Sequence, residues 1–167
     1  SDLRAQVAAN TRGVALVQEL IEANGLDVVV AYMRHIQANC EHAVRLMLKR
    51  FARTHSKQVG AMGERHSEGG EIPEKVVVHA LDRIDDGTPI ELQVTVDGAE
   101  GTAHFDVTGT GAQILGNLNA PPAVTYSAII YCLRCLLSDE DIPLNQGCLA
   151  PITVHIPENT LLLSLIH

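Results

Sequence analysis

The sequence predicts an α+β fold: an N-terminal antiparallel helical hairpin, then an antiparallel β-meander covered by a buried helix, with a further strand. Three observations support this prediction. Apolar residues recur at steps of three and four through residues 3–51, which is typical of amphipathic helices. They alternate with polar residues through 90–107, as in half-buried strands. An almost unbroken apolar run at 124–137 indicates a buried helix.

Two helices joined by a short connection open the chain. The first apolar stripe consists of Leu3, Val7, Val14, Val17 and Ile21. The second consists of Val29, Met33, Ile36, Cys40, Val44, Met47 and Phe51, which predicts a helix of about 27 residues. Glu41 precedes Arg45 by four positions, so an ion pair is expected between them. Gly25 should end the first helix, because glycine accepts a left-handed conformation, and the short connection predicts a hairpin over residues 1–54.

Helical periodicity stops at residues 55–74, a polar segment that contains several glycines. We expect a linker or variable loop there, and with it a domain boundary. Residues 75–167 follow as an α+β segment, which we expect to be an incomplete domain.

Three strands should follow the linker, at 76–84, 90–96 and 103–107, with turns at 85–87 and 97–98. Asn119 is expected to cap the next helix, because Pro121 and Pro122 suit a first turn that needs no amide hydrogen. That helix should be nearly all buried. Alternation at 152–156 predicts the last strand.

Charge and composition exclude some classes of function. Lys and Arg total 12 against 20 Asp and Glu, which gives a formal charge of -8 and argues against nucleic-acid binding. The apolar runs are shorter than the roughly 20 residues that a bilayer requires, so no membrane segment is expected. Four cysteines in apolar surroundings, without a secretory signal, favour reduced thiols and a cytoplasmic protein.

Residues 106–122, DVTGTGAQILGNLNAPP, form a glycine-rich segment that could be a phosphate-binding loop or only a tight connection. A dinucleotide fingerprint needs a third glycine where Ile114 stands, and no Gly-Lys-Ser/Thr phosphate loop occurs in the chain. The predicted helix also begins about ten residues after Gly111, too late for its N-terminus to meet a phosphate held there. A structural glycine turn is therefore favoured over nucleotide binding.

Polar residues gather around this connection. They are Asp106, Thr108, Asn117, Asn119, Thr125 and Ser127. Asparagine amides can hold a substrate amide or carboxylate, but they also satisfy loop backbone groups and cap helices. Spacing alone favours the structural role.

The cysteines and histidines give no clear metal or catalytic motif. Cys132 and Cys135 form a CxxC inside an apolar helix, which is more typical of packed thiols than of zinc ligands. The eight histidines lack the close pairing that two ligands on one face require, so no metal ligand is predicted. Cys148, in a loop beside Gly147, is the best candidate for a catalytic thiol.

Four stretches together resemble the hydantoinase B portion of the ATP-dependent 5-oxoprolinase (hydantoinase B/5-oxoprolinase) family. They are DLRAQVAAN, GLDVVVAYMRHIQANCEHAVR, FDVTGTGAQILGNLNAPPAVTYSAIIYCLRCLL and DIPLNQGCLAPITVHIPENTLL. The resemblance covers most of residues 2–162 and implies a cytoplasmic hydrolase of glutathione metabolism that opens the lactam of 5-oxo-L-proline to L-glutamate. It also implies ATP and Mg²⁺, which a kinase-like hydantoinase A half or subunit would hold outside this chain, and a homo-oligomeric full enzyme.

On this interpretation the region from Asp106 to Asn119 lines or braces the substrate side. The resemblance does not identify the catalytic residues; Asp106 and Cys148 are the candidates. Thr108, Asn117 and Asn119 are candidates for substrate binding. No cofactor ligand or metal ligand is predicted within the chain.

The chain is expected to be a fragment that is inactive alone, because the metal-binding segments of relatives lie upstream of the matched region and LSLIH replaces the usual continuation. Two alternatives remain open. One is an N-methylhydantoinase or acetone-type carboxylase segment of the same family. The other is a non-catalytic assembly module.

Overall fold

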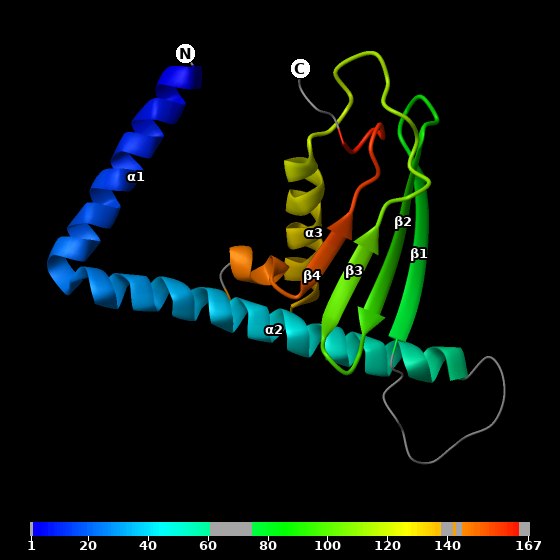
Figure 1. Cartoon of the computed structure of the whole chain (residues 1–167), viewed down its shortest axis with the longest axis horizontal. Helices are drawn as coiled ribbons and strands as arrows, with labels where there is room; N and C mark the ends of the chain where they lie inside the picture. Colours follow the sequence, from blue (N-terminus) through cyan, green and yellow to red (C-terminus); the bar gives the residue numbers. More distant parts are fainter. Residues whose placement is uncertain (1, 61–74, 138–141, 143–144, 164–167) are drawn as a thin grey trace. The chain divides into compact units, whose positions relative to one another are not determined.

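The computed structural model describes residues 2–60, 75–137, 142 and 145–163. The helices are α1 (Asp2–Asn24), α2 (Leu26–Gly60) and α3 (Pro122–Leu136), with a short 3₁₀ helix η1 (Gln146–Leu149). The strands are β1 (Lys75–Arg83), β2 (Pro89–Asp97), β3 (Thr102–Asp106) and β4 (Ile152–His155) (Figure 1). The chain divides into two compact units, residues 1–38 and residues 39–167.

The first unit contains α1 and the beginning of α2. Gly25 joins them with a φ of 85°, and its amide donates to the carbonyl of Ile21 at 2.8 Å, which confirms the predicted helix end. None of the residues of α1 is buried, and the apolar side chains of Leu3 and Val7 remain exposed. No described helix is both long enough and apolar enough to cross a membrane.

Helix α2 is longer than the sequence predicts, at 35 residues, and extends to Gly60. Residues 55–60, which were predicted to be linker, are therefore helical. Each residue added to an existing helix gains a hydrogen bond, and lysine and glutamine, which both occur in this stretch, are good helix formers. The expected pair between Glu41 and Arg45 is present, with Nη2 and Oε1 2.8 Å apart. The rest of the predicted linker, 61–74, lies outside the described residues.

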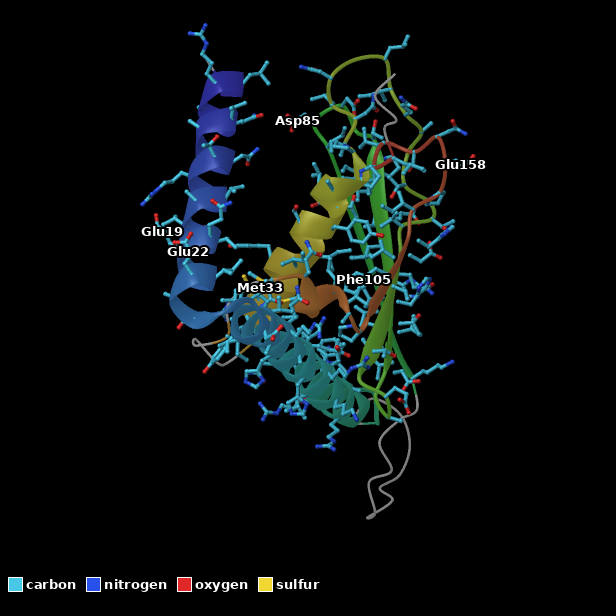
Figure 2. The ribbon with its side chains drawn as sticks, turned by 60° about the vertical axis from the view of Figure 1, so that its left-hand side comes forward. Glu19, Glu22, Met33, Asp85, Phe105 and Glu158 are labelled. Atoms are coloured by element: carbon cyan, nitrogen blue, oxygen red, sulfur yellow. The ribbon has the colours of Figure 1, made fainter. Side chains whose placement is uncertain are left out.

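The four strands form one sheet in the order β1-β2-β3-β4. The first three are antiparallel, as the meander predicts, and β4 joins parallel to β3. Because side chains point alternately to the two faces of a strand, the sheet has an inner apolar face. On this face Val78, Val94, Phe105 and Val154 are neighbours in register. Figure 2 shows Phe105 on this sheet, one residue before the end of β3.

A single cluster of buried residues joins the sheet to two helices in the second unit. Helix α2 contributes Cys40, Val44, Leu48 and Ala52, all at most 4% exposed. Helix α3 contributes Ile129 and Leu133. The predicted apolar stripe on α2 is thus confirmed at Cys40 and Val44. Beyond Val44 the buried residues are Leu48 and Ala52, whereas the predicted Met47 and Phe51, each one position earlier in the sequence, are only partly buried.

Helix α3 covers the sheet with one face only, so the expectation of nearly complete burial is wrong. Ile129 and Leu133 are buried, whereas Tyr131 and Leu136 are exposed. The helix packs on the core along a single stripe, and its other side meets no covering element in the described part of the chain. Its N-cap is Pro121, without a side-chain hydrogen bond, so the expected capping role of Asn119 is also wrong.

The turn between β2 and β3 lies directly against α2. Gly101 has a φ of 69°, and a Cβ placed there would stand 2.6 Å from the carbonyl oxygen of Arg45. Asp97 Oδ1 shapes the turn by accepting hydrogen bonds from the amides of Ala99 and Glu100, each at 2.9 Å. Only glycine fits this contact, because any side chain would push the turn away from the helix.

We expect Gly101→Ala to lower the free energy of unfolding by about 3 kcal/mol, from left-handed strain and a collision with the α2 backbone. Gly87→Ala is the matched control: its φ is 88° but the space around it is open, so the loss should be about 1 kcal/mol. Urea unfolding followed by circular dichroism measures both. Equal losses would contradict the tight contact of the turn with α2.

Candidate functional site

The glycine-rich connection between β3 and α3 lies at one end of the sheet and is held there by backbone hydrogen bonds. Gly111 donates to the carbonyl of Pro89 at 2.8 Å and accepts from the amide of Leu161 at 2.9 Å. Further along, Gln113 donates to the carbonyl of Asn159 at 2.8 Å. Figure 2 shows Asp85 and Glu158, from the two flanking loops, at this same end. The connection is therefore fixed on both sides.

The glycines of this connection serve close packing. A Cβ on Gly109, whose φ is 100°, would collide with the carboxylate of Glu91, and a Cβ on Gly111 would collide with the methyl group of Thr88. A carboxylate over the turn repels a phosphate, and α3 begins only at Pro122, which has no amide hydrogen to offer an anion. The residues of the connection therefore do not fit the phosphates of ATP. Among the described residues no group of His, Cys, Asp or Glu side chains could hold a metal ion.

Asp106 and Thr108 form a compact turn at the end of β3. The amide and the hydroxyl of Thr108 both donate to Asp106 Oδ1, at 2.9 and 2.6 Å. These bonds, the hydroxyl first, lower the pKa of Asp106 from its usual 3.8, and His155 and His104 add a smaller effect of the same sign. Asp106 is consequently held ionised and oriented.

The register of the strands places Asp106 in a polar row across the outer face of the sheet. His79 pairs with Gln93, Gln93 with Asp106, and Asp106 with His155, so one residue comes from each strand. A hollow of about 590 Å³ lies at this face, and Asp106 and Thr108 are among its lining residues. Alternation assigns Gln93, Asp106 and His155 to the polar faces of their strands, but the sequence does not give the register that brings them into one row with His79.

The two candidate asparagines have different environments. Asn119 Oδ1 accepts from the amide of Ile114 at 3.0 Å, and its Nδ2 donates to the carbonyl of Ile114 at 2.7 Å and of Gly116 at 3.4 Å. Asn119 thus braces its own loop. Asn117 is exposed, between the exposed side chains of Leu115 and Leu118. Its exposed amide can face solvent or a ligand.

The polar cluster expected around the connection is only partly assembled. Ser127 Oγ donates to the carbonyl of Ala123 at 2.7 Å within α3, and the buried Thr125 Oγ1 has no hydrogen-bond partner among the described residues. Within the described ranges no hydrogen bond joins Asn117 or Asn119 to Asp106. Asp106 and Thr108, by contrast, are bonded directly to each other.

Cys148, the candidate catalytic thiol, lies in η1 and is fully buried. Its Sγ is 2.7 Å from that of Cys40, so it faces another thiol instead of solvent. Burial and the hydrogen bond with Cys148 raise the pKa of Cys40 to about 12. Cys132 and Cys135, by contrast, are exposed on α3.

A sequence model of the family described as hydantoinase B/oxoprolinase matches residues 1–164. The chain belongs to this family. It is 48% identical over 162 residues to 5-oxoprolinase 1 of Arabidopsis thaliana and 44% identical over 162 residues to 5-oxoprolinase of Saccharomyces cerevisiae. Each similarity covers 97% of this chain but only 12% and 11% of the relative's length.

A bacterial relative from Pseudomonas sp. is named as one subunit of a putative D-/L-hydantoinase. It is 31% identical over 169 residues, which cover 96% of this chain and 26% of that protein. The name implies that some family members work with a partner subunit. The chain spans about one eighth of the 5-oxoprolinases and about a quarter of the bacterial relative.

We expect Thr108→Val to raise the pKa of Asp106 toward 3.8, because the mutation removes the hydroxyl that lowers it most. Since the folded pKa lies below the unfolded one, the bond stabilises the fold above about pH 4, and this contribution is lost as the pH falls through the folded pKa. Carboxyl NMR titration measures the change. Thr108→Ser should leave the pKa low; an unchanged pKa in Thr108→Val would contradict the assignment.

Asn119→Ala should lower the free energy of unfolding by about 1–2 kcal/mol, because the amide and carbonyl of Ile114 lose their partners. Asn117→Ala removes an exposed side chain and should change it by less than about 0.5 kcal/mol. Chemical denaturation compares the two variants. Equal stability of both would show that the Asn119 brace contributes nothing.

Proposed function

We propose that this chain is part of an ATP-dependent 5-oxoprolinase, which opens the lactam of 5-oxo-L-proline to L-glutamate and so serves glutathione turnover. The observation that carries the proposal is the 44–48% identity, over 97% of the chain, to proteins named 5-oxoprolinase in two organisms. The chain alone is a small part of such proteins, so the complete reaction is proposed for the full-length protein.

We assign the coupling to ATP to a part of the full enzyme outside this chain. The carboxylate of Glu91 lies against the glycine turn at Gly109, and its negative charge disfavours a phosphate there. A kinase-like hydantoinase A half or subunit would hold ATP and Mg²⁺. The bacterial relative, whose name makes it one subunit of a hydantoinase, supports such a partner.

Asp106 is proposed to bind substrate instead of acting as a general base. A general base works best with a pKa near the working pH, and the bonds from Thr108 lower the pKa of Asp106 still further from that range. An oriented carboxylate is, however, a strong acceptor for the N–H of a lactam. The Thr108 hydroxyl donates to Asp106 and keeps its own lone pairs for a ligand.

Asn117 is the second proposed contact. Its exposed amide can donate to a carboxylate or to a lactam carbonyl, both of which 5-oxoproline carries. Asn119 is proposed to hold the loop that presents Asn117, through its bonds to Ile114 and Gly116. Cys148 is a poor candidate for direct attack on a substrate, because its side chain is completely buried.

A hydantoinase-type activity is the second candidate within the same family, favoured by the 31% identity to the bacterial relative named as a putative D-/L-hydantoinase component. A non-catalytic role in assembly is the alternative outside the enzymes. It is favoured by the exposed apolar side chains of α1 and of the outer side of α3, which a soluble partner would cover.

In the full-length protein we expect Asp106→Asn and Asn117→Ala each to lower kcat/KM for 5-oxoproline about 10- to 100-fold, the effect of losing one hydrogen bond to a charged or polar substrate group. Asn at position 106 keeps the oxygen that accepts from Thr108, so the turn should remain. Glutamate formation coupled to phosphate release is the measurement.

Asp86→Asn is the matched control, because Asp86 accepts from the amide of Thr88 at 2.8 Å in a turn of the same kind but is not one of the proposed substrate contacts. It should leave turnover unchanged. Wild-type kcat/KM in both Asp106→Asn and Asn117→Ala would refute the substrate role. Loss of turnover together with loss of assembly would support the assembly role instead. Faster turnover of hydantoin or acetone than of 5-oxoproline would refute the proposed substrate.

A further inference from the structure

Two thiols from distant parts of the sequence meet in the core of the second unit. Cys40 lies on α2 and Cys148 lies in η1, 108 positions later, and their Sγ atoms are 2.7 Å apart. Both side chains are completely buried, and both cysteines are free thiols. A disulfide bond is about 2.05 Å long, so the two sulfur atoms need to approach by only about 0.7 Å to bond.

The fold holds both thiols in place. Cys40 is one turn from Val44, which is completely buried in the same cluster. In η1, the side chain of Asn145 accepts from the amide of Gly147 at 2.8 Å, and the amide of Cys148 donates to the carbonyl of Asn145 at 3.1 Å. The packing of α2 and the turn of η1 therefore hold the two sulfur atoms close together.

We propose that Cys40 and Cys148 are a redox modification site, at which a hydroperoxide converts the two thiols into an intramolecular disulfide that ties η1 to α2. One thiolate attacks a peroxide oxygen, the O–O bond breaks, and a sulfenic acid forms as hydroxide leaves. The second thiol attacks the sulfenic sulfur, the S–S bond forms and the S–O bond breaks. In total, two thiols and one hydrogen peroxide give one disulfide and two waters.

The reaction is slow in the native state. Neither sulfur is exposed, and the high pKa of Cys40 keeps its thiol protonated, whereas the thiolate is the reactive form. Oxidation thus depends on local opening, for which the four-residue η1 is a suitable element. The exposed Cys132 and Cys135 react faster with any oxidant, so they must be removed to observe the buried pair.

The disulfide closes a long loop and restricts the unfolded chain. From loop-closure entropy, the oxidised protein should unfold at a temperature on the order of 10 °C higher than the reduced one. This inference depends on the core and not on the proposed 5-oxoprolinase activity, so the two can fail separately.

The test oxidises the Cys132→Ser/Cys135→Ser protein with hydrogen peroxide, blocks the remaining thiols, and maps peptides by mass spectrometry without reduction. The expected result is a peptide pair linked through Cys40 and Cys148, lighter by two hydrogens and separated again by dithiothreitol. The midpoint temperature of unfolding should be on the order of 10 °C higher for the oxidised protein and should return to its original value after reduction.

Cys40→Ser and Cys148→Ser in the same background are the matched controls, and both should abolish the linked peptide and the thermal shift. If either variant fails to fold, the peptide map of the folded parent still decides the question. The proposal is refuted if peroxide leaves both thiols free, or carries them to sulfinic acid, while no Cys40–Cys148 peptide forms.

Discussion

The burial of one stripe of α2 against the inner face of the sheet is the interaction on which the second unit depends. Cys40, Val44, Leu48 and Ala52 repeat every four residues and are at most 4% exposed. A four-stranded sheet has a broad apolar face that must be covered, and burial of apolar surface is the main favourable term in folding. Helix α3 packs on part of this face through Ile129 and Leu133, and α2 packs on it through its own buried stripe.

This arrangement also determines where chemistry can take place. The helices occupy the inner face, and within the described residues no helix covers the outer face. The strand register gathers His79, Gln93, Asp106 and His155 there, one from each strand. The end of β3 then presents Asp106 in a turn that Thr108 holds, and the glycine connection returns to the core through backbone hydrogen bonds. Gly109 and Gly111 pack closely against Glu91 and Thr88, which explains these glycines without a phosphate.

Local patterns in the sequence predicted the elements well, because the period of apolar residues reflects which face is buried. The three strands of the meander, the Gly25 helix end and the Glu41–Arg45 pair are confirmed. Patterns could not give contacts between distant segments. The parallel pairing of β4 with β3, the approach of Glu91 to Gly109 and the meeting of Cys40 with Cys148 all depend on tertiary packing. Asn119 was misassigned for the same reason: its spacing suits a helix cap, but Ile114 offers it two hydrogen bonds within the loop.

The most direct test of this account compares two shortened chains, residues 39–167 and residues 75–167, in urea unfolding followed by far-ultraviolet circular dichroism. The first keeps the α2 stripe and should unfold in one cooperative transition. The second keeps every strand and α3 but leaves the inner face of the sheet uncovered beside Val96 and Phe105, so no cooperative transition is expected. A cooperative transition of equal midpoint in both chains would contradict the central role of α2.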